Sequence, residues 1–433
     1  MVESKGKDSK ISRRKFLAYT AAGAVAVGAV AAGAYTFSRS SMPSTPVSTA
    51  PVSMEPIKLG FICSLSPPGP YIAGTNVQRG ALLAAEHINA AGGVLGGRKI
   101  QVISEDDNAA PEKGLAAVTK LATQDKVVAV SGLMMSSVAL AIQSACEQYG
   151  IPMLIAGAGN PDITAKGFKT TFRAHITDID RVYALLNFAK SMGFKKFAII
   201  AEDSDWGIGI VKYIDQFKPQ IYPDAETKSK VFSRKSVDIT PELLEIAAWK
   251  PDVLLEGASQ MFFYMVCKQS REVGLTKKIP FLVAAPELNQ TGAWEAVGEA
   301  GVGAIQTESY LPQMKLTQQG VKAVTAYKEK YKEDMEYYGL NGYSDVMNIA
   351  QAIQAAKSAV PADIVKALET TELERWGSTI RFPTEKGFFY HQASPPVLLT
   401  QYTKLNQAPI NATIIYPPEK ATGKYVAPTT LYP

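Results

Sequence analysis

Cysteine and histidine are scarce in this sequence, with three residues of each among 433. Cys63, Cys146 and Cys267 are far apart and form no C-x-x-C pair, which argues against a disulfide framework and against a zinc site. We expect small buried thiols, although one disulfide plus one thiol stays open for an exported chain. The histidines share no helical spacing, so we expect no bound metal and no cofactor.

An excess of either charge is also missing from most of the chain. The first 56 residues hold seven Lys or Arg against three acidic residues, which leaves 38 basic and 37 acidic residues for the rest. Nucleic-acid binding needs a concentrated basic face, so we expect no nucleic-acid partner. The length, with 46% hydrophobic residues, suffices for two domains.

Catalytic motifs are absent as well. The sequence has no G-x-S-x-G, no P-loop, no complete G-x-G-x-x-G after a strand and no paired His, Cys or carboxylate ligands. We therefore expect no enzyme and no catalytic residue. Asp106 and Asp107 are interpreted as the end of a strand and a cap for a helix that starts at Pro111.

The N-terminal region has the features of a targeting segment. Ser12 to Leu17 reads S-R-R-K-F-L and opens an apolar stretch from Phe16 to Phe37, which resembles a twin-arginine export signal. Cleavage near Ala34 and retention as a membrane anchor are both open, because the stretch is also long enough to span a bilayer. We assign residues 1–37 to this signal or anchor and 38–56 to a Ser/Thr/Pro-rich linker, whose stalk-like composition favours retention. The remainder is expected to be exported, periplasmic or at the cell surface.

Short apolar runs then alternate with helical periodicity in two successive units. In the first unit we predict strands at 57–62, 99–104, 127–131 and 152–156, and helices at 76–91, 111–124 and 137–149. In the second we predict strands at 197–202, 226–232, 253–256 and 280–283, and helices at 179–192, 207–217, 240–248 and 260–273. A further strand at 301–306 and helices at 317–332 and 343–358 follow these two units. This α/β pattern predicts two doubly wound parallel-sheet lobes, with a ligand cleft beyond the carboxyl ends of their strands.

A family resemblance adds to this prediction. Its marks are Gly80-Ala81, the run I-N-A-A-G-G-V-L-G-G-R-K-I from Ile88 to Ile100, Asp106-Asp107, Ile151-Pro152 and N-P-D-I-T from Asn160 to Thr164. With weaker similarity over 203–209 and 382–387, the chain resembles branched-chain amino-acid-binding proteins of the type I periplasmic binding fold. The resemblance implies a three-segment hinge, with 57–176 plus 308–388 as lobe 1 and 177–307 plus 389–433 as lobe 2.

The resemblance also implies a function. The chain would be the extracytoplasmic solute-binding protein of an ABC transporter, capturing an amino acid or an amide-like or small carboxylate solute and delivering it to a permease. A ligand-sensing receptor module of the same fold is the alternative. The membrane would be a partner only through an uncleaved N-terminal segment.

Candidate ligand-binding residues of lobe 1 lie in its strand-to-helix loops. Ser136 and Ser137 combine hydroxyl and backbone N–H groups that suit a carboxylate, with plain N-capping by Ser137 as the structural alternative. The resemblance adds Ala158 and Gly159, where a glycine stands in place of the family's threonine. Tyr71, in the loop after the first strand, is a further candidate contact.

Candidates of lobe 2 are Trp206 and Glu287. Trp206 matches an aromatic residue of the family that packs on the ligand. Glu287 matches the family's partner for a ligand ammonium, with a solvated loop carboxylate as the alternative. Ala258 stands where the leucine-binding relative has a tyrosine. The departures at Gly159 and Ala258 weaken the match to a plain α-amino acid and leave amides, urea-like compounds and aromatic carboxylates open.

Overall fold

The computed structural model describes residues 54–432. The predicted export signal and most of the predicted linker therefore lie outside the described residues. Within 54–432, every helix falls short of the combined length and apolarity that crossing a membrane would require.

The first sheet is parallel throughout and has the order β2-β1-β3-β4-β5. Its strands are β1 (Ile57–Cys63), β2 (Ile100–Asp106), β3 (Val130–Gly132), β4 (Met153–Ile155) and β5 (Thr171–Arg173). We call this sheet and the helices packed on it lobe 1. The switch of direction between β1 and β3 is the place where an open parallel sheet leaves a crevice at its carboxyl edge.

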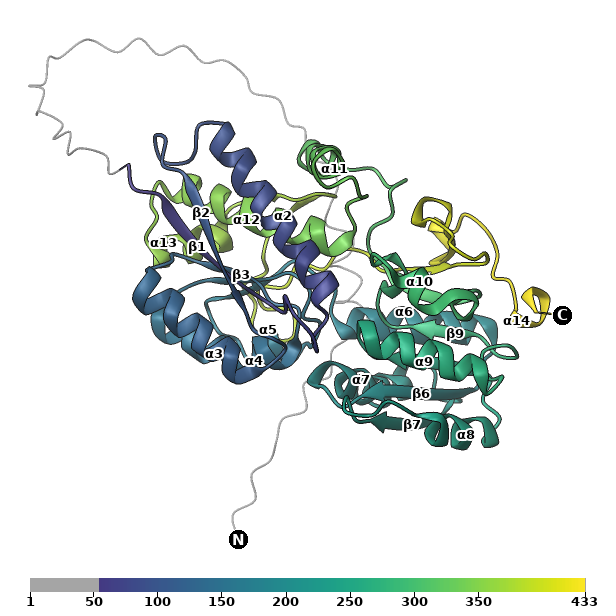
Figure 1. Cartoon of the computed structure of the whole chain (residues 1–433). Helices are drawn as coiled ribbons and strands as arrows, with labels where there is room; N and C mark the ends of the chain where they lie inside the picture. The colour runs from purple at the N-terminus through teal and green to yellow at the C-terminus, as the bar shows by residue number, and fades with distance from the viewer. Residues whose placement is uncertain (1–53, 433) are drawn as a thin grey trace, which may run out of the picture. The chain divides into compact units, whose positions relative to one another are not determined.

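Helices cover both faces of this sheet (Figure 1). One face carries α2 (Tyr71–Ala90), α11 (Gln318–Tyr331), α12 (Tyr337–Ala356) and α13 (Pro361–Thr370), and the other carries α3 (Pro111–Lys120) and α4 (Ser136–Tyr149), with the single turn α5 (Asp162–Ala165) nearby. Alternation along β1 divides the core, because Leu59 and Phe61 point to the α2 side and Ile62 points to the α4 side.

Glycines let α2 and α12 approach closely. A Cβ atom at Gly80 would overlap the Gly339 carbonyl oxygen, and one at Gly342 would overlap the Val77 carbonyl oxygen. The Gly80-Ala81 pair that marks the family resemblance is thus explained by helix packing and not by ligand contact.

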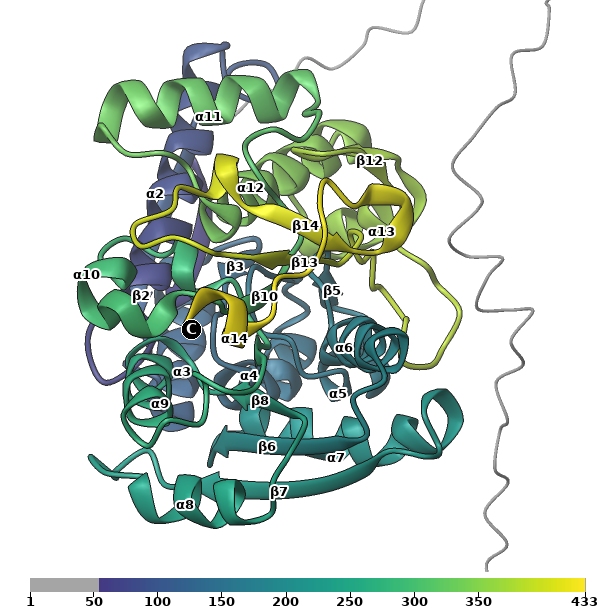
Figure 2. The same ribbon diagram turned by 90° about the vertical axis from the view of Figure 1, so that its right-hand side faces the viewer.

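The second sheet has the order β14-β13-β10-β9-β8-β6-β7. Its strands are β6 (Lys196–Glu202), β7 (Glu226–Phe232), β8 (Val253–Gly257), β9 (Phe281–Val283), β10 (Ile305–Glu308), β13 (Leu398–Gln401) and β14 (Thr413–Tyr416). The first five repeat the parallel order of lobe 1, whereas β13 and β14 are antiparallel additions beside β10 (Figure 2). We call this sheet with its helices lobe 2.

Helices again cover both faces of the lobe 2 sheet. They are α6 (Asp178–Met192) and α7 (Asp205–Ile221) on one side, and α8 (Thr240–Ala248), α9 (Gln260–Glu272) and the short α10 (Ala293–Val297) on the other. Helix α6 starts with a capping box, in which the Thr177 hydroxyl accepts from the Asp180 N–H and the Asp180 carboxylate accepts from the Thr177 N–H. The fold class predicted from the sequence is confirmed.

Two chain segments run side by side where the chain passes between the sheets. Arg173, at the end of β5, pairs with Gln392 in a parallel bridge, and its N–H donates to the His391 carbonyl at 2.9 Å. The fully buried Arg173 guanidinium donates to the carbonyl oxygens of Ala158 and Asn160 at 2.9 and 2.8 Å. One cation therefore ties these segments to a loop at the edge of the cleft.

Several predicted boundaries are wrong. Helix α2 begins at Tyr71, five residues before the predicted start, so this tyrosine is helical and not part of a loop. Asp106 and Asp107 do not cap α3, whose N-cap is Ala110; the Asp107 Oδ1 instead accepts from the Ser64 hydroxyl and the Ala109 N–H. The local bonds of these carboxylates thus hold the loops after β1 and β2.

Further differences concern the region after residue 297. The turn 298–301 and strand β10 replace the predicted strand at 301–306, and helix α13 was not predicted. The minor strands β11 (Leu373–Glu374) and β12 (Thr379–Ile380) and the turn α14 (Pro428–Leu431) complete the elements there.

The cysteines are buried and unpaired. Cys63, Cys146 and Cys267 are free thiols with no exposed surface, and burial raises the pKa of each. The interpretation as small buried thiols holds in the structure, and the alternative of one disulfide does not.

Candidate functional site

A cleft lies where the carboxyl edges of the two sheets face each other, with about 480 Å³ of space between protein atoms, part of it open to solvent. Lobe 1 lines it with Pro70, Ala73, Met134, Met135, Ser136, Gly157 and Tyr338. Lobe 2 lines it with Arg181, Glu202, Trp206, Ser259, Ala285 and Glu287. Of the predicted site residues, the structure thus brings Ser136, Trp206 and Glu287 together around one space.

Lobe 1 presents hydrogen-bond donors at the start of α4. The helix begins at Ser136 and its N-cap is Met135, which offers no side-chain cap, so Ser137 is not the N-cap that the structural alternative required. The first N–H groups of a helix have no acceptor within the helix. Ser137 lies outside the cleft lining, although its Oγ is buried and without a partner. Ser136 lines the cleft, and its Oγ already accepts from the Asn160 N–H at 3.2 Å. This corner can accept a carboxylate.

The backbone of Ala158 is already engaged. Its N–H donates to the Leu133 carbonyl at 3.1 Å, and its carbonyl accepts from Arg173 at 2.9 Å. Ala158 and Gly159 lie outside the cleft lining. A Cβ atom at Gly159 would overlap the Asp178 Oδ1, so the Asp178 carboxylate fills the place where the resembling family has a threonine side chain.

Asp178 and Arg181 fix the wall of lobe 2. Asp178 is fully buried at the start of α6, and its Oδ1 accepts from the Trp206 Nε1 at 2.9 Å, which holds the indole ring at the cleft. Arg181 donates to the Ala284 carbonyl at 2.8 Å, contacts the His175 Nε2 at 3.1 Å and lies 3.7 Å from Asp178. Burial lowers the pKa of His175 well below its usual value, so its ring is a neutral acceptor for Arg181.

Glu287 is a buried carboxyl with one backbone partner. It is 6% exposed, at the start of a 3₁₀ turn, Glu287–Asn289, after β9. Its Oε2 accepts from the Gln260 N–H at 3.2 Å. Burial, reinforced by Glu202, raises the pKa of Glu287 to about 8. The alternative of a solvated loop carboxylate is therefore wrong, and a ligand cation here would favour ionisation.

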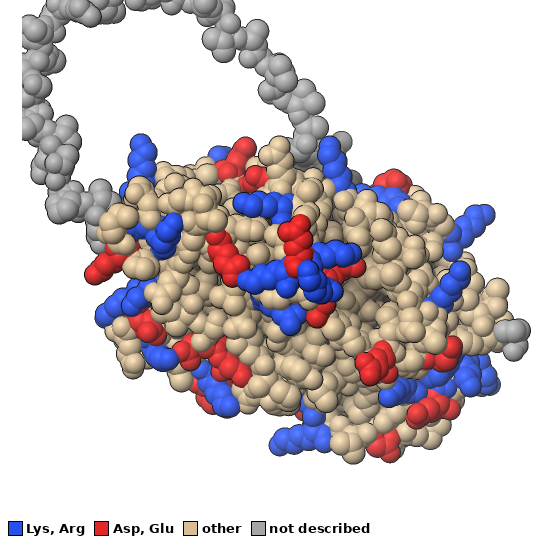
Figure 3. Space-filling model, turned by 45° about the horizontal axis from the view of Figure 1, so that its top comes forward, with Lys and Arg blue, Asp and Glu red and all other residues tan. Residues whose placement is uncertain are grey.

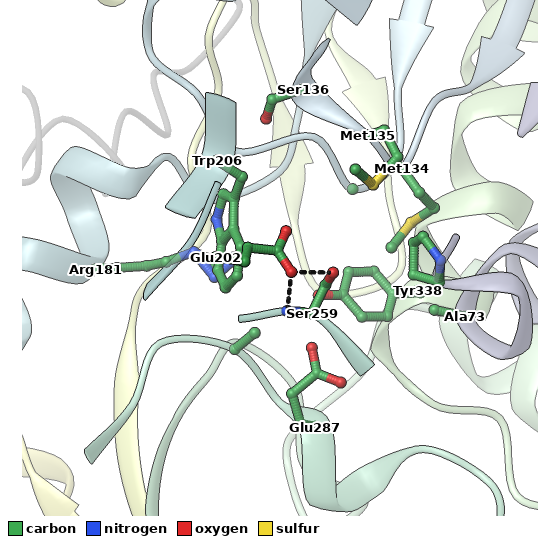
Figure 4. A pocket seen from close by; sticks show the side chains of 13 residues that line it. Ala73, Met134, Met135, Ser136, Arg181, Glu202, Trp206, Ser259, Glu287 and Tyr338 are labelled. Carbon is green, nitrogen blue, oxygen red and sulfur yellow. Dashed lines mark hydrogen bonds between the residues drawn. The ribbon is translucent and has the colours of Figure 1, made fainter. Parts of the chain in front are cut away.

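Glu202, which the sequence did not single out, ends β6 and is fully buried. Its Oε2 accepts from the N–H and the hydroxyl of Ser259, both at 3.0 Å, and its Oε1 accepts from the Ser204 hydroxyl at 2.6 Å. Figure 4 shows the carboxylates of Glu202 and Glu287 pointing toward the middle of the cleft, with Met134, Met135 and Tyr338 across from them.

Tyr71 and Ala258 do not line the cleft. Tyr71 is the first residue of α2, beside the lining residue Pro70. Ala258 follows β8, is fully buried and packs in the lobe 2 core. Its N–H donates to the Glu256 carboxylate at 2.5 Å, so a carboxyl group and not an aromatic ring organises this strand end.

Sequence reasoning missed Arg181, Glu202 and Tyr338. Arg181 is inside the predicted helix 179–192, where nothing distinguished it from an exposed polar residue, and Tyr338 lies before the predicted helix 343–358, whereas α12 begins at Tyr337. A usable signal existed for Glu202, because an acidic residue that directly follows the apolar run of a strand lies at the edge where ligands bind.

The surface carries no large field of one sign on the face drawn in Figure 3, where acidic and basic side chains are interspersed. Exposed pairs such as Lys328 with Asp334 at 2.7 Å contribute to this pattern. In the described residues, no group of three His, Cys, Asp or Glu side chains could hold a metal ion.

Two sheets of the same strand order that meet at a lined cleft define a two-lobed binding protein of the type I periplasmic fold. Residues 56–407 match the family described as periplasmic binding protein, so the chain belongs to that family. The resemblance noted in the sequence is confirmed. This family and the solved relatives below are solute-binding proteins and not enzymes, as the sequence predicted.

Named relatives agree with this assignment. The chain is 28% identical over 304 residues to an amino acid binding protein of Pseudomonas aeruginosa, covering 69% of this chain and 78% of that protein. It is 27% identical over 322 residues to a Leu/Ile/Val-binding protein homologue of Brucella melitensis, covering 72% and 83%.

Solved structures share the fold. A branched-chain amino acid transporter substrate-binding protein of Streptococcus pneumoniae in complex with isoleucine is similar at a TM-score of 0.72 and 21% identity, over 84% of this chain and all of that one. An ABC transporter solute-binding protein of Rhodopseudomonas palustris in complex with benzoate has a TM-score of 0.72 and 20% identity, over 83% and 95%.

Proposed function

We propose that the chain is the exported solute-binding protein of an ABC transporter, which captures an amino acid or an amide-like or small carboxylate solute in the cleft and delivers it to the permease. The observation that carries the proposal is a single cleft in which lobe 1 offers hydrogen-bond donors and lobe 2 offers a carboxyl group. Unpaired donors at the start of α4 and the Ser137 hydroxyl suit a carboxylate, and the buried Glu287 suits an ammonium.

The relatives support the same class of solute. One relative is an amino acid binding protein, and the two solved structures hold isoleucine and benzoate. Isoleucine and benzoate share a carboxylate beside an apolar body. Trp206, Met134 and Tyr338 in the cleft lining can pack on such a body.

Closure of the lobes is part of the proposal. We place the crossovers near residues 176, 307 and 388, so that lobe 1 is 57–176 plus 308–388 and lobe 2 is 177–307 plus 389–433. The two lobes already contact each other beside the cleft, since the Asn160 Nδ2 donates to the Asp205 carbonyl at 3.0 Å and the Tyr213 hydroxyl to Asp162 at 3.2 Å. Such interlobe hydrogen bonds would form as a hinge closes the lobes around the solute.

Binding can be tested by thermal shift, followed by calorimetry with the best solute from a panel of amino acids, amides, urea and benzoate. We expect Ser137→Ala to weaken binding of that solute at least about tenfold, because a hydrogen bond to a charged group contributes about 1.5–3 kcal/mol. Trp206→Ala is also expected to weaken binding, because the indole ring packs on the apolar body of the solute. Ser378→Ala and Trp249→Ala, which belong neither to the cleft lining nor to the start of α4, serve as matched controls. Unchanged affinity in both cleft variants would falsify the site.

Export through the twin-arginine signal is proposed from Arg13 and Arg14, which lie outside the described residues. Replacing both by lysine keeps the charge and removes the twin-arginine pair. We expect most of the chain to remain in the cytoplasm, as measured by cell fractionation and immunoblotting. Lys5→Arg with Lys7→Arg is the control pair, and normal export of the twin-lysine variant would rule out this route.

A further inference from the structure

Three glutamates gather at the cleft because their strands are neighbours. Glu202 ends β6, Glu256 lies in β8, and Glu287 follows β9, and these three strands are adjacent in the order β9-β8-β6. Glu202 and Glu256 are fully buried and Glu287 is 6% exposed. Glu202 and Glu287 line the cleft. Glu256 lies outside the lining but belongs to the same cluster, since burial and then the charge of Glu287 raise its pKa.

None of these three carboxyl groups has a protein cation as a direct partner. Across the described residues, none of the three forms a salt bridge. Their partners are neutral donors, namely Ser204 and Ser259 for Glu202, the Ala258 N–H for Glu256 and the Gln260 N–H for Glu287. Arg181, the only cation in the cleft lining, is already bonded to the Ala284 carbonyl and paired with Asp178.

Two unsatisfied polar atoms lie next to the lining carboxylates, on residues just outside the cleft lining. The Glu256 Oε2 is buried without a hydrogen bond. Gln260 is 2% exposed, and its Nε2 also lacks a partner although its N–H reaches Glu287. Its φ of 37° is unfavourable for a residue other than glycine, and such strain persists mainly at functional sites.

A cationic ligand would stabilise these buried carboxylates more than a neutral ligand would. Buried carboxylates lose hydration and repel one another, so the cleft wall of lobe 2 gains most from a ligand that brings positive charge. One ammonium opposite Glu287 leaves Glu202 with only neutral hydrogen-bond donors as direct partners. A second basic group on the same molecule can reach it, while Trp206 and Met134 enclose the methylene stem between the two charges.

We propose that the solute is an amino acid with a basic side chain, whose side-chain cation lies against Glu202, with Glu256 behind it, while Glu287 takes the α-ammonium. This proposal rests on the proposed function and narrows its class of solute. It makes Glu202 the residue that selects the side chain and leaves the donors of α4 to hold the carboxylate.

The test is calorimetry on the purified protein with matched ligands. L-lysine is compared with L-norleucine, which has the same carbon chain without the ε-ammonium, and with Nε-acetyl-L-lysine, whose ε-nitrogen is neutral; L-arginine is the second basic probe. We expect L-lysine or L-arginine to bind at least about tenfold more tightly than both neutral analogues. Equal or tighter binding of L-norleucine overturns the proposal while the proposed function stands.

Variants of Glu202 and Glu287 distinguish selection of the side chain from binding of the amino acid itself. Glu202→Gln keeps the size of the side chain and is expected to reduce the preference for L-lysine over L-norleucine at least about tenfold, whereas Glu287→Gln weakens both ligands together. Glu245→Gln, an exposed acid of the same lobe paired with Lys230, leaves both unchanged. A Glu202→Gln variant with the parent's preference overturns the role of Glu202.

Two further results would also overturn the proposal. Heat from CaCl₂ or MgCl₂ that displaces L-lysine assigns the carboxylates to a metal ion instead. Failure of every amino acid to bind while an amide or benzoate binds overturns the inference and leaves the proposed function standing, whereas failure of every solute in the panel removes both.

Discussion

Replacing Arg173 by methionine is expected to destabilise the protein by at least about 3 kcal/mol, because several buried acceptors lose a charged donor at once. The guanidinium donates to the Ala158 and Asn160 carbonyl oxygens and to the Thr164 Oγ1 at 3.2 Å, and it also bonds to the Gln392 amide oxygen. Burial lowers the pKa of Arg173 to about 10, so the residue remains charged at neutral pH.

Urea unfolding measures this effect as a shift in midpoint at unchanged slope. Arg234→Met is the matched control, because Arg234 forms only a partly exposed pair with Asp203 at 3.4 Å and such pairs contribute about 0–1 kcal/mol. If Arg173→Met unfolds at the same urea concentration as Arg234→Met, the cation does not hold the crossover and the cleft loop together. Weakened binding without loss of stability would equally contradict this structural role.

The affinity for an amino acid is expected to rise by between about tenfold and a hundredfold from pH 6 to pH 8. Glu287, with a pKa of about 8, is protonated in the empty cleft at pH 6 and must ionise to pair with an ammonium. Each pH unit below that pKa costs at most about a factor of ten in affinity. Calorimetry at several pH values measures the slope, and Glu287→Gln should flatten it.

Other groups facing Glu287 set the size of this effect. They are Glu202 of β6, Glu256 of β8, Arg181 of α6, Tyr264 of α9, and Glu336 and Tyr338 of α12. Arg181 favours the ionised form of Glu287, whereas Glu202 and Glu336 oppose it. Persistence of the full slope in Glu287→Gln would show that a different group controls binding.

The same carboxyl predicts how the stability of the empty protein depends on pH. Its folded pKa of about 8 lies above the ordinary 4.5, so its contribution to stability is fully present below pH 4.5 and is lost as the pH rises through about 8. The urea midpoint of the empty protein should therefore fall over this range by more than that of Glu287→Gln. An identical pH dependence in the two proteins would contradict the burial of this group.

The sequence predicted the doubly wound architecture because apolar runs and helical spacing are local signals. Strand β7 and helix α8 have the predicted bounds. The start of α2 was missed because Tyr71 to Thr75 lie before the clear periodicity. The antiparallel pairing of β13 and β14 depends on contacts with β10 that are distant in sequence.

The cleft was predicted in outline, but its chemistry was only partly predictable. Trp206 and Glu287 follow strands, and their place at the carboxyl edge comes from topology alone. The sequence could not show that the Asp178 carboxylate occupies the space beside Gly159, where the resembling family has a threonine side chain. This contact depends on where α6 begins relative to the 157–160 loop. Arg181 was missed because the sequence pattern of a helix does not distinguish a buried arginine from a polar residue on the solvent-exposed face.

The three unpaired thiols have a consequence for when the protein can fold. Cys63, Cys146 and Cys267 make no covalent link in the described residues, so the folded form of this part of the chain depends on no oxidant. Maturation of the two lobes is then the same in a reducing cytosol as outside the cell. A chain of this kind can reach its final shape before it is carried across a membrane.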